Sequence, residues 1–344
     1  MTGEHIALAL RGAWRRNAAP IPLTAGRLAP CVDALVRSGA AALVWQRLRR
    51  TDWCDDSVLH PLRDAFRTEL VRAALNTRHV AKVVGEMRAS AIDTILLKGW
   101  SVAMSYADPD LRPLGDIDLL VRQSDGVRAQ ATAAAFAAHR PHIDLHTSLL
   151  DLTDRTVADL FTRSRVIPLG EVDVRVLCPE DQFRHLCLHF FRHAGSRPLW
   201  LCDIAATLEA MTQEFDWELC LGGDALLSER VVASVGLAQM LLDARPACPL
   251  PSRWARRVPA WLSRAVLTSW GTRFDPRVYR PTAMSLSLRA PGEIVPALLR
   301  RWPNPLEATV QRAAHLTGMW RPVVQLHEAI VRARRFLPRL MAGI

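Results

Sequence analysis

The first ninety residues place apolar side chains three and four positions apart, with polar residues between them. The spacing recurs over residues 7–16, 31–50 and 59–91, and a period near 3.6 residues is typical of amphipathic helices. Pro20, Pro22 and Pro30 interrupt the pattern between the first two stretches. The sequence therefore predicts an N-terminal helical region over residues 1–91.

From residue 92 to residue 178 the pattern changes to short apolar runs separated by turn residues. Runs at 93–97, 116–121 and 142–146 predict strands, and residues 166–177 predict a β-hairpin. Helical spacing lies between these runs at 100–107, 125–140 and 156–164, and it returns from residue 179 onward. We expect an α+β protein that is predominantly helical, with a small α/β core at 92–178 between helical regions at 1–91 and 179–344.

Composition narrows the class of protein. The chain has 344 residues, half of them hydrophobic, but no uninterrupted apolar run approaches the length of a transmembrane helix. The N-terminus lacks the features of a signal peptide. Seven cysteines are scattered without a Cys-x-x-Cys pair, which argues against a disulfide framework and a zinc knuckle. We expect a cytoplasmic protein without a transmembrane segment.

The positive charge is unevenly distributed. The formal net charge is +10, yet residues 251–344 hold 16 arginines and four acids, a charge of +12, which leaves −2 for the first 250 residues. A basic region of this kind predicts an anionic partner such as RNA, a lipid surface or an acidic substrate. Arginine-rich solvated helices explain the same charge equally well, so both interpretations stay open.

Two carboxylates interrupt one of the apolar runs. Asp116 and Asp118 are separated by a single residue, and side chains at this spacing in a strand share a face, about 7 Å apart. Burying carboxylates without a partner is costly, so a cation is expected between them. A third carboxylate, Asp144, lies in the next predicted strand. Three carboxylates suit Mg²⁺, and such a site can hold two ions that assist phosphoryl transfer.

A Lys-Gly turn lies just upstream of these carboxylates. Lys98 and Gly99 follow one predicted strand and open a predicted helix, where backbone N–H groups and an ammonium are available to a phosphate chain. Lys98 is one of only two lysines among the 44 basic residues, the other being Lys82. The turn is therefore a candidate phosphate site.

The run LLKGWSVAMSYADPDLRPLGDIDLLV, residues 96–121, resembles the signature of the uncharacterised bacterial nucleotidyltransferase family within the polymerase-β-like superfamily. That signature has a Leu-Lys-Gly turn, a Tyr-x-x-Pro loop and Arg-Pro-x-Gly-Asp-x-Asp. The similarity continues in IDLHTSLL, although Thr147 stands where the family has Trp, and in CPEDQFRHLCLHFFRHAGSRPLWLCDIA. It covers roughly residues 60–240.

The resemblance implies a minimal nucleotidyltransferase fold and a role for each matching residue. It makes Asp116 and Asp118 paired metal ligands and Asp144 the third catalytic carboxylate. The segment before Asp144 is short for the family's extra strand, so Asp173 is the substitute if Asp144 does not fill this role. The residues implied in nucleotide binding are Lys98, Gly99, Ser101, Arg112 and Gly115.

Several nearby residues have two interpretations. Asp144 can instead be the structural partner of an arginine or of His146. His185, His189 and His193 recur on one helical face, either as metal ligands or as hydrogen-bonded imidazoles packed near the site. Three further residues are candidates to line the acceptor side of the site, namely Arg197, Trp200 and Asp203. For Trp200, packing in the core is the alternative.

The leading hypothesis is an enzyme that uses Mg²⁺, with Mn²⁺ as a substitute, to move a nucleoside monophosphate from an NTP. ATP is the expected NTP. The acceptor is unidentified, and the candidates are a peptide, a saccharide or RNA; the charge argument above favours an anionic one. The alternatives are kinase-like phosphate transfer to a peptide, toxin-like modification of RNA or protein, and a non-catalytic module that binds anions or nucleic acid. A complete carboxylate triad favours the enzyme. The sequence predicts no oligomeric state.

Overall fold

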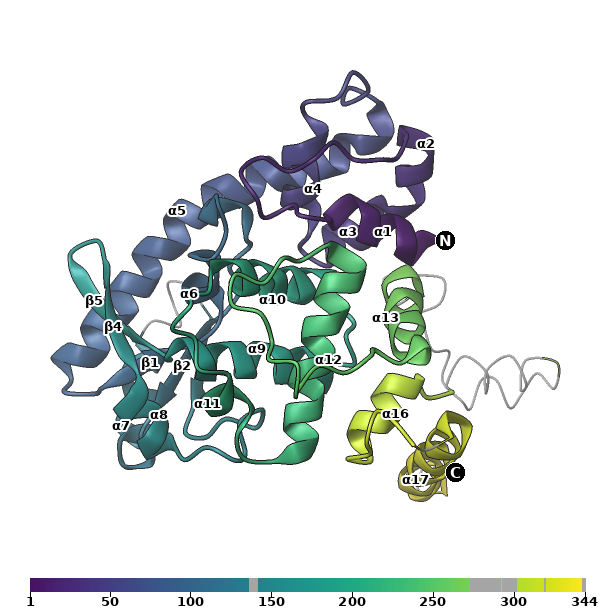
Figure 1. The fold of residues 1–344 in the computed structure, drawn as a ribbon. Coiled ribbons are helices and arrows are strands. Elements are labelled where there is room, and N and C mark those ends of the chain that lie inside the picture. The colour runs from purple at the N-terminus through teal and green to yellow at the C-terminus, as the bar shows by residue number, and fades with distance from the viewer. Residues whose placement is uncertain (136–141, 273–291, 293–301, 319, 342–344) are drawn as a thin grey trace.

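The computed structural model describes residues 1–135, 142–272, 292, 302–318 and 320–341, and for 335–341 the backbone only. One small sheet lies at one side of a mainly helical protein, and the helices nearest the two ends of the chain lie away from it (Figure 1). The α+β, mainly helical fold class is confirmed. The N-terminal part is helical as predicted, with α1 (Thr2–Leu10), α2 (Ala25–Leu28), η1 (Ala29–Cys31), α3 (Val32–Arg37), α4 (Ala41–Leu48), η2 (Ser57–Leu59) and α5 (His60–Ala89).

The sheet has five strands in the order β3-β2-β1-β5-β4. The central strands β1 and β2 are antiparallel, β2 runs parallel to β3, β1 runs parallel to β5, and β4 and β5 form the predicted hairpin. The predicted strands are thus present as β1 (Thr94–Leu96), β2 (Ile117–Val121), β3 (Ile143–His146), β4 (Arg165–Leu169) and β5 (Val172–Val176).

Short helices connect these strands, and they are α6 (Gly99–Ala103), η3 (Pro109–Leu111), η4 (Gln123–Asp125), α7 (Gly126–Ala134) and α8 (Val157–Arg163). The helix predicted over 125–140 is therefore confirmed in its first part, since residues 136–140 lie outside the described residues. The helix predicted at 156–164 is present as α8, whereas the helix predicted at 100–107 is present only in its first part, since α6 ends at Ala103.

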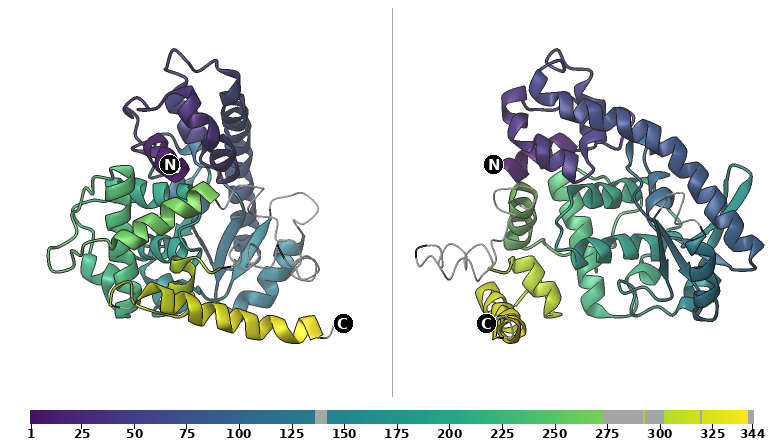
Figure 2. Two further views of the ribbon diagram at one scale, coloured as in Figure 1. Left: turned by 90° about the vertical axis from the view of Figure 1, so that its right-hand side faces the viewer. Right: turned by 180° about the vertical axis from the view of Figure 1, so that it is seen from behind.

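Alternation along β2 divides the sheet into two faces. Ile117, Leu119 and Val121 pack with apolar residues of α5 and α7 in one core. Leu120 belongs to the other core, which also contains much of α9 (Pro179–Arg192). Because side chains alternate across a strand, Asp118 faces the same side as Leu120, toward α9. The long α5 crosses the opposite side of the sheet (Figures 1 and 2).

The rest of the described chain is helical. It comprises, after α9, α10 (Pro198–Ala210), α11 (Trp217–Leu221), α12 (Ala225–Leu242), α13 (Ala260–Thr272), α16 (Pro305–Gln311) and α17 (Arg321–Met341). Among the described residues α12 alone is long and apolar enough to cross a membrane by length and composition, and 61% of it is buried inside the protein. It packs against α9 and α10, as a core helix does.

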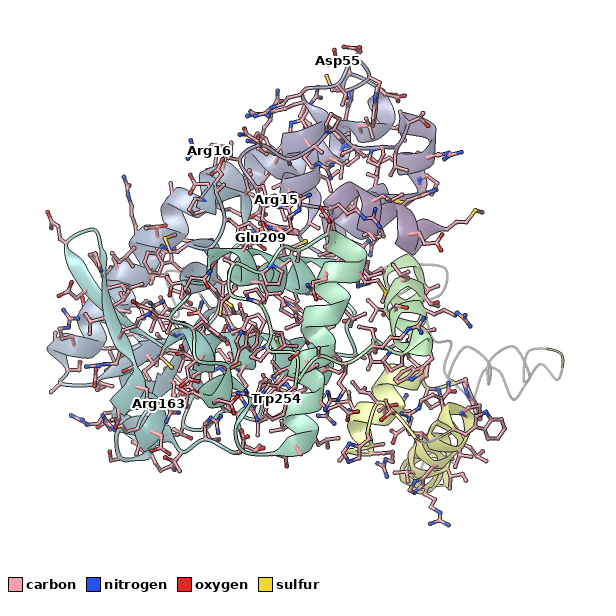
Figure 3. The ribbon with its side chains drawn as sticks, viewed as in Figure 1. Arg15, Arg16, Asp55, Arg163, Glu209 and Trp254 are labelled. Carbon is pink, nitrogen blue, oxygen red and sulfur yellow. The ribbon has the colours of Figure 1, made fainter. Side chains whose placement is uncertain are left out.

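The N-terminal helices pack directly on this C-terminal group. One hydrophobic core contains residues of α1, α4, α9, α10 and α13. At its edge Arg15 donates to Glu209 of α10, with 2.8 Å between Nε and Oε2, and Trp14 donates to the same carboxylate (Figure 3). Whether the boundaries at 91 and 178 delimit separate domains stays a prediction.

Candidate active site

Asp118 and Asp144 lie side by side on β2 and β3. The two residues are paired in the parallel register of these strands, so their side chains project from the same face of the sheet. His146, two residues beyond Asp144, joins them: its Nε2 lies 3.0 Å from Asp118 Oδ1 and 3.4 Å from Asp144 Oδ2. One ligand atom from each of the three side chains lies within 4.8 Å of the others, the one such group among the described residues.

A lysine supplies the cation that the sequence requires here. Lys98 Nζ lies 3.3 Å from Asp118 Oδ1, and each side chain is 16% exposed. Burial alone raises the pKa of Asp118, but the hydrogen bond with His146 and the charge of Lys98 outweigh it, so the pKa lies below its ordinary value. Asp118 is therefore a stable carboxylate in a largely buried setting.

The turn that carries Lys98 is strained. Lys98 has φ of 40° and Gly99 has φ of 44°, a region that a lysine adopts only at a cost. The buried hydroxyl of Ser101 donates to the Lys98 carbonyl at 2.8 Å and so helps to hold the turn. Strain of this kind is commonly stored at functional sites. The geometry gives Ser101 a role in shaping the turn, while phosphate binding by Lys98 and Gly99 stays a prediction.

Asp116 lies apart from this group. It precedes the first residue of β2, its side chain is 60% exposed, and its Oδ1 lies 3.6 Å from His142 Nδ1. A β-carbon added to the neighbouring Gly115 meets no atom within 4 Å, so there is open space beside the loop. Metal binding by Asp116 and nucleotide binding by Gly115 stay predictions.

Arg112 is held inside the protein by Asp203 of α10. Its Nε lies 3.1 Å from Oδ1 and its Nη2 lies 2.8 Å from Oδ2, and Tyr106 donates to the same carboxylate at 2.7 Å. Burial alone lowers the pKa of Arg112, but Asp203 raises it above its ordinary value. The guanidinium thus anchors the loop that leads to Asp116, and nucleotide binding by Arg112 stays a prediction.

A second polar cluster surrounds Asp151, which is 5% exposed and follows β3. Its Oδ2 lies 3.2 Å from His189 Nδ1 and 3.6 Å from His185 Nδ1, and its Oδ1 lies 2.9 Å from Arg192 Nε. His189 also contacts the ring of Trp200 at 4.8 Å between centroids. The predicted packing of hydrogen-bonded imidazoles near the site is confirmed for His189.

Asp173, the substitute for Asp144, is exposed on β5, and β1 separates that strand from β2. The structure thus brings Asp144, rather than Asp173, to Asp118. The sequence suggested His146 only as a structural partner of Asp144, and it gave no role to Asp151. The alternation of Asp144 and His146 along one strand could have revealed the histidine, whereas Asp151 carried no local signal.

Comparison with known proteins supports the same region of the chain. A family model described as an uncharacterised nucleotidyltransferase matches residues 30–135 and 129–223, together more than half of the chain. Asp118 lies in the first stretch, and Asp144, Asp151 and Asp203 lie in the second. No curated protein and no solved structure gives a significant match.

Proposed function

Because the chain belongs to the uncharacterised nucleotidyltransferase family, whose activity is the transfer of a phosphorus-containing group, we propose that it moves a nucleoside monophosphate from ATP to an unidentified acceptor with the help of Mg²⁺. The observation that carries this proposal is the register of β2 and β3, which pairs Asp118 with Asp144 beside Lys98. Carboxylates next to a phosphate-binding cation are what nucleotidyl transfer requires.

The residues present fit a divalent metal. Asp118 and Asp144 offer hard oxygen ligands, and His146 offers a nitrogen, which Mn²⁺ accepts more readily than Mg²⁺ does. Asp116 stands on the adjoining loop as a further carboxylate. A metal held here would neutralise charge on the phosphates of the nucleotide. We propose two ions, shared among Asp116, Asp118 and Asp144.

The protein's own groups have complementary roles in this proposal. Lys98 and the backbone of Gly99 bind phosphate oxygens, and Ser101 keeps their turn in shape. The pair of Arg112 and Asp203 fixes the loop before Asp116, so that the carboxylates are held in place before the nucleotide arrives.

The proposal is tested with ATP labelled at the α- or the γ-phosphate, incubated with Mg²⁺ and with peptide, saccharide or RNA acceptors. Transfer of the α-label is the expected result, and Asp118→Asn is the control that abolishes it. Transfer of the γ-label alone would instead identify a phosphotransferase. If ATP binds without transfer of either label to any acceptor or to water, the protein is a binding module.

We also propose that the protein acts in the cytoplasm. All seven cysteines are free, and six of them are buried, which supports a reducing compartment. Fractionation of cells that produce the tagged protein tests this proposal, and recovery from the periplasm or the medium would contradict it.

A further inference from the structure

The Asp151 cluster faces the same side of the sheet as the carboxylates. Asp118 projects toward the core that contains α9, and α9 carries both His185 and His189. The positive charge of Lys98 lies close enough to lower the pKa of both histidines, although burial is the larger cause. Lys98 is therefore a neighbour common to the candidate metal site and the histidines.

The two helices that carry the cluster are fixed to the loop of the candidate site. Asp203 of α10 holds Arg112, and Trp200 lies one helical turn earlier on the same face of α10. Trp200 in turn contacts the rings of His189 and His193, at 4.8 and 5.0 Å between centroids. This chain of contacts positions the imidazoles relative to the carboxylates.

His189 is oriented as a base. Burial alone raises the pKa of Asp151, but opposing effects, the largest of them the hydrogen bond with His189, bring it below its ordinary value. Asp151 is therefore an ionised carboxylate that can only accept hydrogen bonds. The proton between Asp151 and His189 is therefore on Nδ1, and Nε2 keeps a lone pair. His189 also retains some exposure, 11% of its side chain against 4% for His185.

The environment of His189 keeps the ring neutral. Burial lowers its pKa, and the charges of Lys98 and Arg192 act in the same direction, while Asp151 opposes them. His185 and His193 flank it on α9, and both have lowered pKa values, about 3 and about 4. The uncharged Trp200 completes its surroundings from α10. A neutral imidazole is the form that accepts a proton.

We propose that Asp151 and His189 form the acceptor side of the active site, where His189 accepts the proton of an alcohol hydroxyl. The proposal rests on the proposed nucleotidyl transfer and names the acceptor class, a hydroxyl of a saccharide, of a nucleic acid or of a Ser, Thr or Tyr side chain. Anionic nucleophiles such as carboxylates or phosphates carry no proton to remove, so they need no such base.

The step balances without a further reactant. The hydroxyl oxygen bonds to the α-phosphorus of the NTP while its proton passes to Nε2 of His189. The bond between the α-phosphorus and the bridging oxygen breaks, and pyrophosphate leaves with that electron pair. The imidazolium, stabilised by Asp151, then releases its proton to water. The imidazole of His189 is neutral, so it can accept this proton at neutral pH.

The test measures pyrophosphate release from ATP, with Mg²⁺ or Mn²⁺ present and glycerol as the probe alcohol. His189→Ala is expected to lower the rate by about 10² to 10⁴-fold. Added imidazole is expected to restore part of the rate, because it replaces the missing base. Binding of a fluorescent ATP analogue is expected to change by less than about twofold, since a base for the acceptor does not hold the nucleotide. The exposed His327 provides the matched control, His327→Ala, with an unchanged rate.

Asp151→Asn is the second variant. An amide in place of the carboxylate donates to Nδ1 and favours the wrong tautomer, so the rate is expected to fall by about 10²-fold or more. The tautomer is read directly in the folded wild-type protein from ¹⁵N chemical shifts of the imidazoles. A proton on Nε2 rather than Nδ1 of His189 would overturn the proposal even if the variants failed to fold.

The outcomes separate this proposal from the proposed function. If Asp118→Asn abolishes pyrophosphate release but His189→Ala stays within about threefold of wild type, the base assignment alone is wrong. Loss of analogue binding in His189→Ala, or no rescue by imidazole, also overturns it. If the wild-type protein releases no pyrophosphate with any NTP, the nucleotidyl transfer fails and this proposal fails with it.

Discussion

Lys98 Nζ and Asp118 Oδ1 are 3.3 Å apart, so the strained turn after β1 and the carboxylate on β2 meet in one ion pair. Without a nucleotide this contact balances the charge of Asp118. It also keeps an ammonium at the edge of the candidate metal site, where the phosphates of an NTP would replace the carboxylate as its partner. The relationship predicts that Lys98 matters more for binding than for stability.

Lys98→Ala is expected to weaken ATP binding by about tenfold or more, because a charged phosphate contact is lost. The free energy of unfolding is expected to fall by less than about 2 kcal/mol, since His146 still pairs with Asp118. Calorimetric titration and urea unfolding measure the two effects. The matched control is Lys82→Ala, at the only other lysine, which is exposed on α5. Equal ATP affinity in Lys98→Ala and wild type would contradict the phosphate role.

Asp116→Asn, Asp118→Asn and Asp144→Asn are each expected to abolish nucleotidyl transfer. Each change removes a negative charge at nearly constant volume, so the fold is retained and metal affinity is lost. Electron paramagnetic resonance measures the loss of Mn²⁺ binding, and circular dichroism measures whether the fold is retained. Asp173→Asn is the control, since Asp173 is exposed on β5. Near-full activity in any of the three variants would remove that residue from the site.

Strand periodicity and the family signature were enough to predict the neighbouring carboxylates Asp118 and Asp144. Both signals are local, and the register between β2 and β3 turned them into a contact. The ion pair of Arg112 was not predictable in the same way, because its partner Asp203 is 91 positions away in the sequence. The same holds for Asp151, which meets His189 only after α9 has packed against the sheet. Long-range packing therefore decided which polar residues are partners.

Asp203→Asn is expected to destabilise the protein by about 3 to 5 kcal/mol, because it leaves Arg112 as an uncompensated buried charge. Urea unfolding measures the loss. The double variant Arg112→Met with Asp203→Leu removes both charges and is expected to recover much of the stability. The exposed pair of Arg175 and Asp93 is the control, since Arg175→Ala should cost less than about 1 kcal/mol. A small loss in Asp203→Asn would show that the pair is not the anchor of the loop.

His185 predicts how stability depends on pH. Burial lowers its pKa from 6.5 to about 3, so the folded protein keeps the ring neutral while the unfolded chain takes up a proton below pH 6.5. His185 therefore costs no stability above pH 6.5. As the pH falls from 6.5 toward 3, the free energy of unfolding falls by about 1.4 kcal/mol per pH unit. His193, with a pKa lowered to about 4, adds to the same trend.

The check is urea unfolding of wild type and His185→Leu at a series of pH values. Between pH 6.5 and 4, the unfolded variant is expected to take up about one proton fewer relative to the folded variant than wild type does. The slope of its free energy of unfolding against pH is therefore smaller. Both ring nitrogens of His185 lack a hydrogen-bond partner, so leucine at this position should not lower stability at neutral pH. An unchanged slope in the variant would mean that other groups cause the acid sensitivity.

The charge of +12 over residues 251–344 predicts a salt-dependent contact with an anionic acceptor. The described residues show that part of this charge is used internally. Arg332 pairs with Glu307 and with the buried Glu328, each at 2.9 Å, and Arg321 donates to the carbonyl of His315. The side chain of Arg335 lies outside the described residues. The arginines to change are therefore exposed ones, namely Arg257, Arg264 and Arg334.

The triple change of Arg257, Arg264 and Arg334 to Gln is expected to weaken binding of a homopolymeric RNA and to reduce the steepness of its salt dependence, because fewer counterions are released. ATP affinity should respond little to the change, since at about 0.15 M salt exposed charges act over roughly 8 Å. Arg332→Gln is the contrasting variant, expected to lower stability because the buried Glu328 loses a partner. Fluorescence anisotropy at two salt concentrations measures RNA binding. If the affinity for RNA changes neither with salt nor with the triple change, the arginines form a solvated surface, and the acceptor must be recognised elsewhere.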